Sequence, residues 1–239
     1  LNLPPSPGDS GAAIGAAYYG FINKNDKTVS KNNLNKNIFP GILKSSEEFY
    51  DLVFEKIAGD NNSIEKAAET IAEDQIIATC FSNIETGPRA LGHRSLICNA
   101  HKAELIKVLS TEIKKRNIFR PTAPAVLEKD AENYFHLEKK LMNCYTHMGA
   151  TATPKDSVLN DIKGVIHVDN TSRVQICDEE SLLGKLLMSL NKHKIQVIAN
   201  TSFNISSDPM VYDKEDAFLA IERMGIKYLL TETGLYKRK

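Results

Sequence analysis

Basic side chains gather in two segments that glycine and proline shape, and these are the residues best suited to chemistry. Residues 85–95 read Glu-Thr-Gly-Pro-Arg-Ala-Leu-Gly-His-Arg-Ser, and residues 114–124 read Lys-Lys-Arg-Asn-Ile-Phe-Arg-Pro-Thr-Ala-Pro. Glycine adopts backbone conformations that other residues avoid and proline fixes φ, so both segments are predicted to be loops of defined shape. A guanidinium held on such a loop pairs with two phosphate or carboxylate oxygens at once. The pair of loops therefore indicates an anion site, with solvated basic loops as the plainer alternative.

Two later polar segments are further candidates for ligand contacts. Residues 167–175 read His-Val-Asp-Asn-Thr-Ser-Arg-Val-Gln, and residues 200–204 read Asn-Thr-Ser-Phe-Asn directly after the apolar run 195–199. Open α/β sheets usually bind ligands at the carboxyl ends of their strands. Capping of turns is the structural alternative for these short polar side chains.

Apolar periodicity predicts the elements that position these segments. Strands are expected at 76–81, 122–127, 165–169, 173–177, 195–199 and 228–231. Helices are expected from the Ser45/Glu48 capping box to Gly59, and at 64–71, 102–113, 128–135, 182–190 and 213–225. Residues 136–164 are weakly patterned and are expected to form a mobile loop. Strands and helices alternate without a regular βαβ repeat, which predicts an α/β domain with a twisted, mostly mixed sheet.

The N-terminal part has a different composition. Residues 3–17 form a proline-fixed loop that leads into a helix rich in small residues, with Asp9 or Ser10 as its cap. A glycine-rich helix start also offers free N–H groups to an anion. Residues 22–45 are rich in Asn and Lys and are predicted to be a linker.

Composition limits the function classes. The 239 residues carry 30 basic and 30 acidic side chains, which argues against bulk binding to nucleic acid or an anionic membrane. No apolar run approaches the roughly 20 residues that span a bilayer. Four widely spaced cysteines are predicted to be reduced core thiols: Cys80, Cys98, Cys144 and Cys177. A cytoplasmic setting is expected.

The four blocks at 87–95, 114–124, 167–175 and 200–204, in this order, resemble the C-terminal half of the NodU/CmcH-type O-carbamoyltransferases. The resemblance covers nearly the whole chain. It implies a YrdC-like domain over 46–239, preceded by the linker 22–45 and, at 1–21, the C-terminal end of a sugar-kinase/actin-like (ASKHA) ATPase domain. The rest of that first domain is expected upstream of Leu1.

The resemblance also implies residue roles. Phosphate-binding residues of the catalytic site fall on Arg89, Lys114 and Arg120. Nucleotide or phosphate contacts fall on Arg116, Arg173, Asn200, Ser202, Asn204, Ser10 and Gly11. Asp9 falls on a metal ligand whose histidine partners are expected upstream. His93, where the family usually has Asn, and His167 are interpreted as structural or proton-transferring.

The implied reaction is formation of carbamoyl-adenylate from ATP and carbamoyl phosphate, followed by transfer of the carbamoyl group to the hydroxyl of a small-molecule acceptor. ATP and Mg²⁺ are the implied cofactors, with Fe²⁺ or a similar divalent metal in the first domain. A membrane partner is not expected, nucleic acid is disfavoured, and a homodimer is left open.

Three departures from the family pattern keep alternatives open. Residues 82–86 lack the usual cation and aromatic residue, Asn117 replaces an acidic residue, and 206–208 replace a Gly-Glu pair. One alternative is a catalytically degenerate nucleotide-binding module with a regulatory or interaction role. The other is a tRNA-associated YrdC-like binding domain, which the neutral charge disfavours.

Overall fold

A mixed sheet forms the centre of the molecule in the computed structural model, which describes residues 6, 8–25, 41–42, 54–117 and 119–239. Eight described strands follow the order β2-β12-β11-β3-β5-β10-β6-β9. They are β2 Phe54–Gly59, β3 Ile77–Thr79, β5 Ser95–Asn99, β6 Ala123–Leu127, β9 Gln175–Cys177, β10 Val197–Ser202, β11 Tyr228–Thr231 and β12 Gly234–Arg238. The β11–β3 and β6–β9 pairs are parallel, and the other neighbours are antiparallel.

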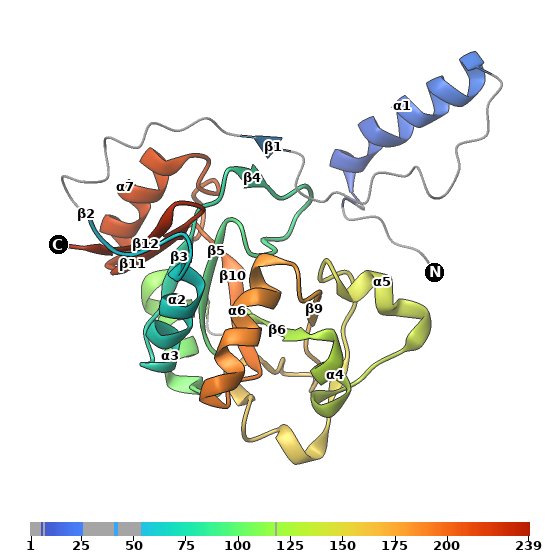
Figure 1. Cartoon of the computed structure of the whole chain (residues 1–239). Helices are drawn as coiled ribbons and strands as arrows, with labels where there is room; N and C mark the ends of the chain where they lie inside the picture. Colours follow the sequence, from blue (N-terminus) through green and yellow to red (C-terminus); the bar gives the residue numbers. More distant parts are fainter. Residues whose placement is uncertain (1–5, 7, 26–40, 43–53, 118) are drawn as a thin grey trace.

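Helices and short elements surround this sheet (Figure 1). The α-helices are α1 Asp9–Asn25, α2 Ser63–Ala72, α3 Ala103–Lys107, α4 Glu128–Tyr134, α5 Met142–Tyr145, α6 Leu182–Leu190 and α7 Lys214–Met224. A wider π-helical turn, η3 Val108–Ile113, continues α3. Short 3₁₀ turns are η4 Lys139–Leu141, η5 Asp156–Val158, η6 Lys163–Val165 and η7 Asn191–His193. Two small ladders pair β1 Gly41–Ile42 with β4 Asn83–Ile84, and β7 Phe135–His136 with β8 Thr153–Pro154.

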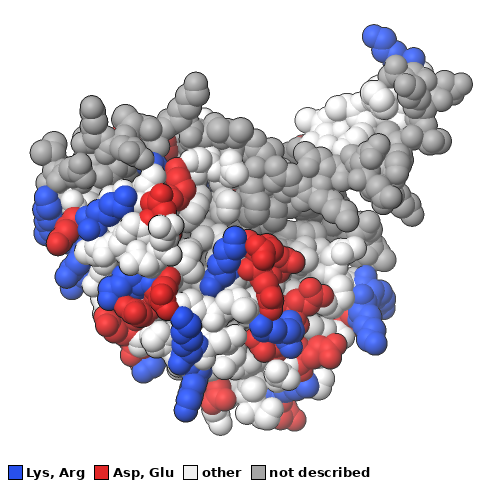
Figure 2. Space-filling view, in the orientation of Figure 1, with Lys and Arg blue, Asp and Glu red and all other residues white. Residues whose placement is uncertain are grey.

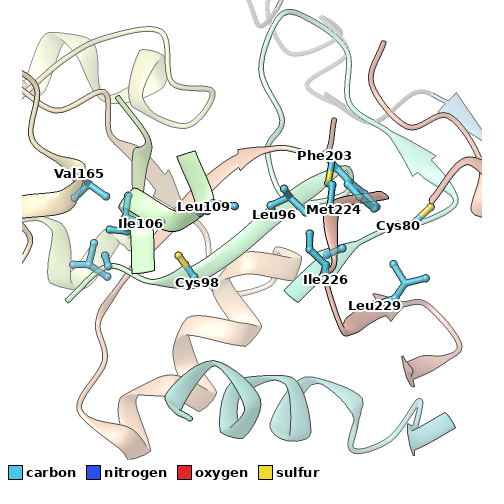
Figure 3. Close-up of a cluster of buried hydrophobic side chains, with 14 of the residues drawn as sticks. Cys80, Leu96, Cys98, Ile106, Leu109, Val165, Phe203, Met224, Ile226 and Leu229 are labelled. Atoms are coloured by element: carbon cyan, nitrogen blue, oxygen red, sulfur yellow. The ribbon is translucent and has the colours of Figure 1, made fainter. Parts of the chain in front are cut away.

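Alternating side chains of the strands build two cores, one on each face of the sheet. In β5, Leu96 and Cys98 pack on the face covered by α3, η3 and α7, whereas Ile97 packs on the face covered by α2 and α6. Successive strand residues point to opposite faces, so apolar side chains in succession require both faces to be covered. Figure 3 shows the first core, where Ile106 and Leu109 from α3 and η3 approach the sheet.

All four cysteines are free and buried, as predicted, and Cys80, Cys98 and Cys177 belong to these two cores. Burial raises the pKa of the thiols of Cys80, Cys98 and Cys177 to about 12. A thiol that stays protonated is a poor nucleophile and metal ligand, so these side chains serve packing.

The fold class is confirmed as a mixed α/β sheet, and most predicted elements are present. The helices near 64–71, 102–113, 128–135, 182–190 and 213–225 appear as α2, α3 with η3, α4, α6 and α7. The strands near 76–81, 122–127, 195–199 and 228–231 appear as β3, β6, β10 and β11. The last strand, β12, was not predicted.

The helix predicted to end at Gly59 is wrong over its final residues. Its start at Ser45/Glu48 lies outside the described residues, but residues 54–59 form strand β2, paired with β12. The register shifts between Leu235 and Tyr236, and Ile57 is the additional residue on β2. Because of this bulge, Phe54 and Ala58 face different cores although they are four residues apart. Pairing with β12 therefore overrides a spacing that imitates a helix.

The segment 22–45 includes the end of α1 at Asn25 and the strand Gly41–Ile42, which pairs with β4; residues 26–40 and 43–45 lie outside the described residues. Its role as a linker stays a prediction. Two further predictions need correction. Residues 165–169 are not a strand, because the N–H of His167 binds the Thr171 carbonyl at 2.7 Å and that of Asn170 binds the His167 carbonyl at 3.0 Å, which closes a local turn. The weakly patterned segment 136–164 contains β7, β8, α5 and short 3₁₀ turns.

Gly184 in α6 offers a test of how closely this layer packs. A Cβ added there would lie 1.8 Å from the carbonyl oxygen of Asp178, whereas one added at Gly15 in α1 would meet nothing within 4 Å. Gly184→Ala should therefore lower the free energy of unfolding by about 1–3 kcal/mol, as overpacking does. Gly15→Ala is the control and should cause no loss, since alanine favours helix. Urea unfolding checks this, and equal stability of Gly184→Ala and the unaltered chain would contradict it.

Candidate anion-binding site

The loop that carries Arg89 is built around the buried carboxylate of Glu85. One oxygen, Oε1, accepts the backbone N–H groups of Leu91 at 2.9 Å, His93 at 2.7 Å and Arg94 at 3.0 Å. Gly87 and Gly92 have φ of 104° and 125°, a region that favours glycine. The chain thus closes on itself around the carboxylate, and Arg89 lies within the closed turn.

Two buried amides hold the same loop from the other side. Asn200 Nδ2 donates to the Ala90 carbonyl at 3.1 Å and to Gln175 Oε1 at 2.7 Å. Gln175 Nε2 donates to the Leu91 carbonyl at 3.0 Å. Asn200, predicted as a nucleotide contact, is 1% exposed and supports the backbone next to Arg89.

Arg94 is an anchor of this loop. Its side chain is 1% exposed, and its Nε and Nη2 donate to the Tyr212 carbonyl at 3.2 and 2.7 Å. Nη1 donates to the carbonyls of Phe81 and His93. Arg94 therefore connects the loop to the segment before α7, while Arg89 makes no hydrogen bond or ion pair within the described part of the chain.

The second basic segment leaves the π-helical turn η3 and lies over the end of β10. Lys114 is fully buried, and its Nζ donates to the Ser202 carbonyl, to the Asn204 carbonyl at 2.7 Å and to Asn204 Oδ1 at 3.1 Å. Arg116 donates from Nη1 to Thr201 Oγ1 at 2.9 Å and from Nη2 to Ser202 Oγ at 3.1 Å. The predicted residues Lys114, Arg116, Ser202 and Asn204 thus form one network.

Mutual electrostatic effects show that the predicted cations converge. Burial first, and then the charges of Arg116 and Arg120, lower the pKa of Lys114 to about 6. Burial lowers the pKa of Arg116 to about 10, with Arg120 and Arg173 as the next causes. The pKa of Arg173 is lowered by burial, then by Arg89 and Arg120. Arg120 acts on Lys114 and Arg116 of its own segment and on Arg173. Arg89 also acts on Arg173, so Arg173 connects the two basic segments.

No acidic group neutralises this cluster within the described residues. None of the ion pairs found there includes Arg89, Lys114, Arg116, Arg120 or Arg173. The guanidiniums of Arg89, Arg120 and Arg173 also have no hydrogen-bond acceptor there, and Arg173 Nε is buried without a partner. Three guanidiniums are therefore available to an anion, whereas Lys114 and Arg116 already bind the end of β10. On the face shown in Figure 2, by contrast, acidic and basic side chains lie intermixed.

The two histidines occupy different surroundings. His93 Nδ1 lies 2.7 Å from the Asn83 carbonyl, and its ring packs beside Phe81; burial lowers its pKa. His167 Nδ1 lies 3.2 Å from Thr171 Oγ1 in the turn described above. Burial lowers the pKa of His167, Asp169 opposes that shift, and Arg173 adds to it. Both contacts match the structural alternative proposed from the sequence.

The predicted N-terminal site residues lie on α1. Asp9 is exposed in its first turn, followed by Ser10 and Gly11. The Gly11 N–H binds the Gly8 carbonyl at 2.9 Å, and a Cβ on Gly11 would overlap the Ser6 carbonyl. Within the described ranges, no group of three His, Cys, Asp or Glu side chains is arranged to hold a metal. The roles of Asp9, Ser10 and Gly11 remain predictions.

Sequence reasoning missed Glu85 and Gln175 as functional residues. Glu85 binds backbone N–H groups of its own loop, and Gln175 binds a carbonyl of that loop from a distant strand; neither contact produces a periodic sequence pattern. Glu85 lies inside the first glycine-proline segment, and Gln175 ends the segment that contains Arg173. The signal for both residues is burial, which only the structure shows: a buried polar side chain needs hydrogen-bond partners, and these reveal what it supports.

The fold and the site define a class: a mixed α/β domain with a group of basic side chains near the end of strand β10. The family model described as "Carbamoyltransferase C-terminus" matches residues 68–238. The chain therefore belongs to the carbamoyltransferase C-terminal family.

Relatives support this membership. The chain is 30% identical over 177 residues to nodulation protein NolNO of Sinorhizobium fredii, covering 73% of this chain and 26% of that protein. It is 29% identical over 208 residues to nodulation protein U of Azorhizobium caulinodans, covering 84% and 34%. An uncharacterized Synechocystis protein is 27% identical over 260 residues, covering 96% and 42%. The chain thus spans less than half the length of these relatives.

Solved structures confirm the YrdC-like fold expected from the sequence. Full-length HypF in a phosphate- and nucleotide-bound form matches with a TM-score of 0.54 at 19% identity, over 74% of this chain and 25% of that one. YciO of E. coli matches with a TM-score of 0.52 at 12% identity, over 72% and 77%. These likenesses describe the fold alone. Among the described helices, none is long and apolar enough to cross a membrane.

Lys114 yields a prediction about pH. An anion bound among the cations replaces repulsion by attraction, so it raises the pKa of Lys114 from its free value of about 6. Binding at pH 7.5 should therefore take up a proton, and affinity should fall as pH rises above 6. Calorimetric titration with sulfate, which does not titrate in this range, in two buffers of different ionisation enthalpy measures the uptake.

Lys114→Met is the control and should lose most of this proton uptake. The remainder should come from His167, which also lies near Arg173. Equal binding heats in both buffers for the unaltered chain would contradict the prediction.

Proposed function

We propose that this domain binds ATP and carbamoyl phosphate and forms carbamoyl-adenylate, the donor from which a carbamoyl group is passed to a substrate hydroxyl. The observation that carries the proposal is the convergence of five cations without a neutralising carboxylate among the described residues. ATP and carbamoyl phosphate are both negatively charged and must approach each other in this reaction, which a group of cations would favour. Membership of the carbamoyltransferase family supplies the carbamoyl chemistry.

The proposed reaction has two balanced steps. Water cleaves carbamoyl phosphate, so that carbamate and inorganic phosphate are released. A carbamate oxygen then attacks the α-phosphorus of ATP, a new O–P bond forms, and the bond to the leaving pyrophosphate breaks. Negative charge is brought together in both steps, so positioning and electrostatic stabilisation are the protein's main tasks.

The geometry divides the residues by role. Arg89, Arg120 and Arg173 have free guanidiniums and would contact phosphate oxygens directly. Lys114 and Arg116 would act indirectly, because they fix Ser202 and Asn204 at the end of β10. Arg116 would add positive charge, and Lys114 would do so once a bound anion has raised its pKa. Asn200 would position the Arg89 loop through the Ala90 carbonyl.

The family implies two metals, Mg²⁺ with ATP and a divalent ion at Asp9, and the described residues would hold them in different ways. Mg²⁺ prefers oxygen ligands and often binds substrate phosphates, so it would be held by ATP at a site whose own side chains are cationic. Asp9 belongs to no group of three or more potential metal-ligating side chains within the described ranges. No step proposed here is assigned to that metal. ATP as substrate and free, buried cysteines support a cytoplasmic setting.

Release of pyrophosphate tests the proposal. With ATP, Mg²⁺ and carbamoyl phosphate, the chain should release pyrophosphate, and omission of carbamoyl phosphate should abolish it. Arg120→Ala should reduce kcat/KM roughly 10- to 150-fold, the equivalent of one charge-assisted hydrogen bond of about 1.5–3 kcal/mol. Arg120 is exposed, so its truncation should leave stability unchanged.

Lys129→Ala is the matched control, because Lys129 pairs with Glu179 at 2.7 Å on the exposed surface and takes no part in the cluster. This variant should retain full activity. Absence of carbamoyl-phosphate-dependent release at saturating ATP would overturn the proposal and favour the non-catalytic nucleotide-binding module.

A further inference from the structure

The Glu85 carboxylate has an unusual set of partners for a group so near a cation cluster. It is 6% exposed, and Oε1 accepts three backbone N–H groups. Its second oxygen, Oε2, is buried and has no hydrogen-bond partner. No ion pair of the described residues includes Glu85, although cations lie on the loop that it closes. All hydrogen bonds of the Glu85 carboxylate are therefore made to backbone N–H groups of its own loop.

Glu85, Asn200 and Gln175 hold two consecutive peptide units that lie shortly after Arg89 in the chain. Glu85 takes the N–H of Leu91 at 2.9 Å, and Gln175 binds the carbonyl of the same residue at 3.0 Å. Asn200 binds the carbonyl of Ala90 at 3.1 Å. The Ala90–Leu91 peptide group is thus held by Glu85 and Asn200, and the Leu91–Gly92 group by Gln175. Fixing this backbone limits the directions in which the Arg89 side chain can leave the loop.

We propose that Glu85, with Gln175 opposite it, is a positioning residue that holds the Arg89 guanidinium in the anion site before ligand arrives. This inference rests on the proposed function, because it concerns the same site. Glu85 touches no substrate and acts through the backbone between Leu91 and Arg94. A charged acceptor suits this task because hydrogen bonds to an ionised acceptor are about twice as strong as neutral ones.

The alternative is a purely structural role, in which loss of Glu85 loosens the whole site. The two roles differ in which cation they affect. Arg89 lies on the loop that Glu85 closes, whereas Arg120 lies on the other basic segment and binds through its backbone N–H to Asn117 at 3.0 Å. Positioning predicts coupling of Glu85 to Arg89 and independence from Arg120.

Calorimetric titration with inorganic tripolyphosphate measures this coupling. Glu85→Gln should weaken binding about tenfold, because the neutral amide keeps one acceptor but loses the charge. In an Arg89→Ala background the same substitution should change affinity less than twofold. In an Arg120→Ala background it should again weaken binding about tenfold.

Glu232→Gln is the control variant. Glu232 is another partly buried carboxylate, which binds the Ser82 hydroxyl and pairs with Lys214 at 3.6 Å, without contact to the Leu91 amide. Its substitution should leave tripolyphosphate affinity unchanged. Hydrogen exchange adds a second readout, since the amides of Leu91, His93 and Arg94 should exchange faster in Glu85→Gln.

If Glu85→Gln does not fold, Gln175→Met can be compared in the same two backgrounds. It removes the donor to the Leu91 carbonyl with little change in side-chain volume. If the substitution weakens binding tenfold in both the Arg89→Ala and Arg120→Ala backgrounds, or does not weaken it in the folded single variant, the positioning role is wrong. The proposed function would not be affected by either result. Absence of tripolyphosphate binding by the unaltered chain would overturn the proposed function and this inference with it.

Discussion

Repulsion among partly buried cations is the constraint on which the site depends. Like charges a few ångströms apart in a protein of effective dielectric about 20 repel by several kcal/mol, and burial adds a desolvation cost. Lys114, Arg116 and Arg173 carry this cost, because burial and neighbouring arginines lower the pKa of each, and none of them forms an ion pair among the described residues. A polyanion relieves both the repulsion and the unsatisfied donors, so the arrangement favours ligand binding at the expense of stability.

Hydrogen bonds to the surrounding backbone offset part of this free-energy cost. Carbonyl and hydroxyl oxygens at the end of β10 receive Lys114 and Arg116, and the two cores on either face hold β10 in place. Glu85, Gln175 and Asn200 fix the other basic loop. Donors that are fixed before the ligand arrives lose little freedom on binding, which is the physical basis of preorganised electrostatic catalysis.

The sequence could predict the elements whose causes are local. Glycine and proline mark the two basic loops, and apolar spacing predicts α2, α6 and β10. Pairing across the sheet could not be predicted: β12 supplies the partner and the bulge that make residues 54–59 a strand, and a turn closed by His167 and Thr171 replaces the strand expected at 165–169. Convergence of the cations was inferred through family resemblance, whereas the support that Asn200 gives to the Arg89 loop required the coordinates. The predicted roles of the site residues stay predictions.

A crystal structure of the chain grown with tripolyphosphate would test most directly whether the two basic segments form a single anion site. The cluster described here predicts one tripolyphosphate whose oxygens lie within hydrogen-bond distance of the guanidiniums of Arg89, Arg120 and Arg173. Lys114 and Arg116 should keep their contacts to Ser202 and Asn204. Tripolyphosphate bound to only one of the two loops, or elsewhere on the chain with these three guanidiniums facing solvent, would contradict it.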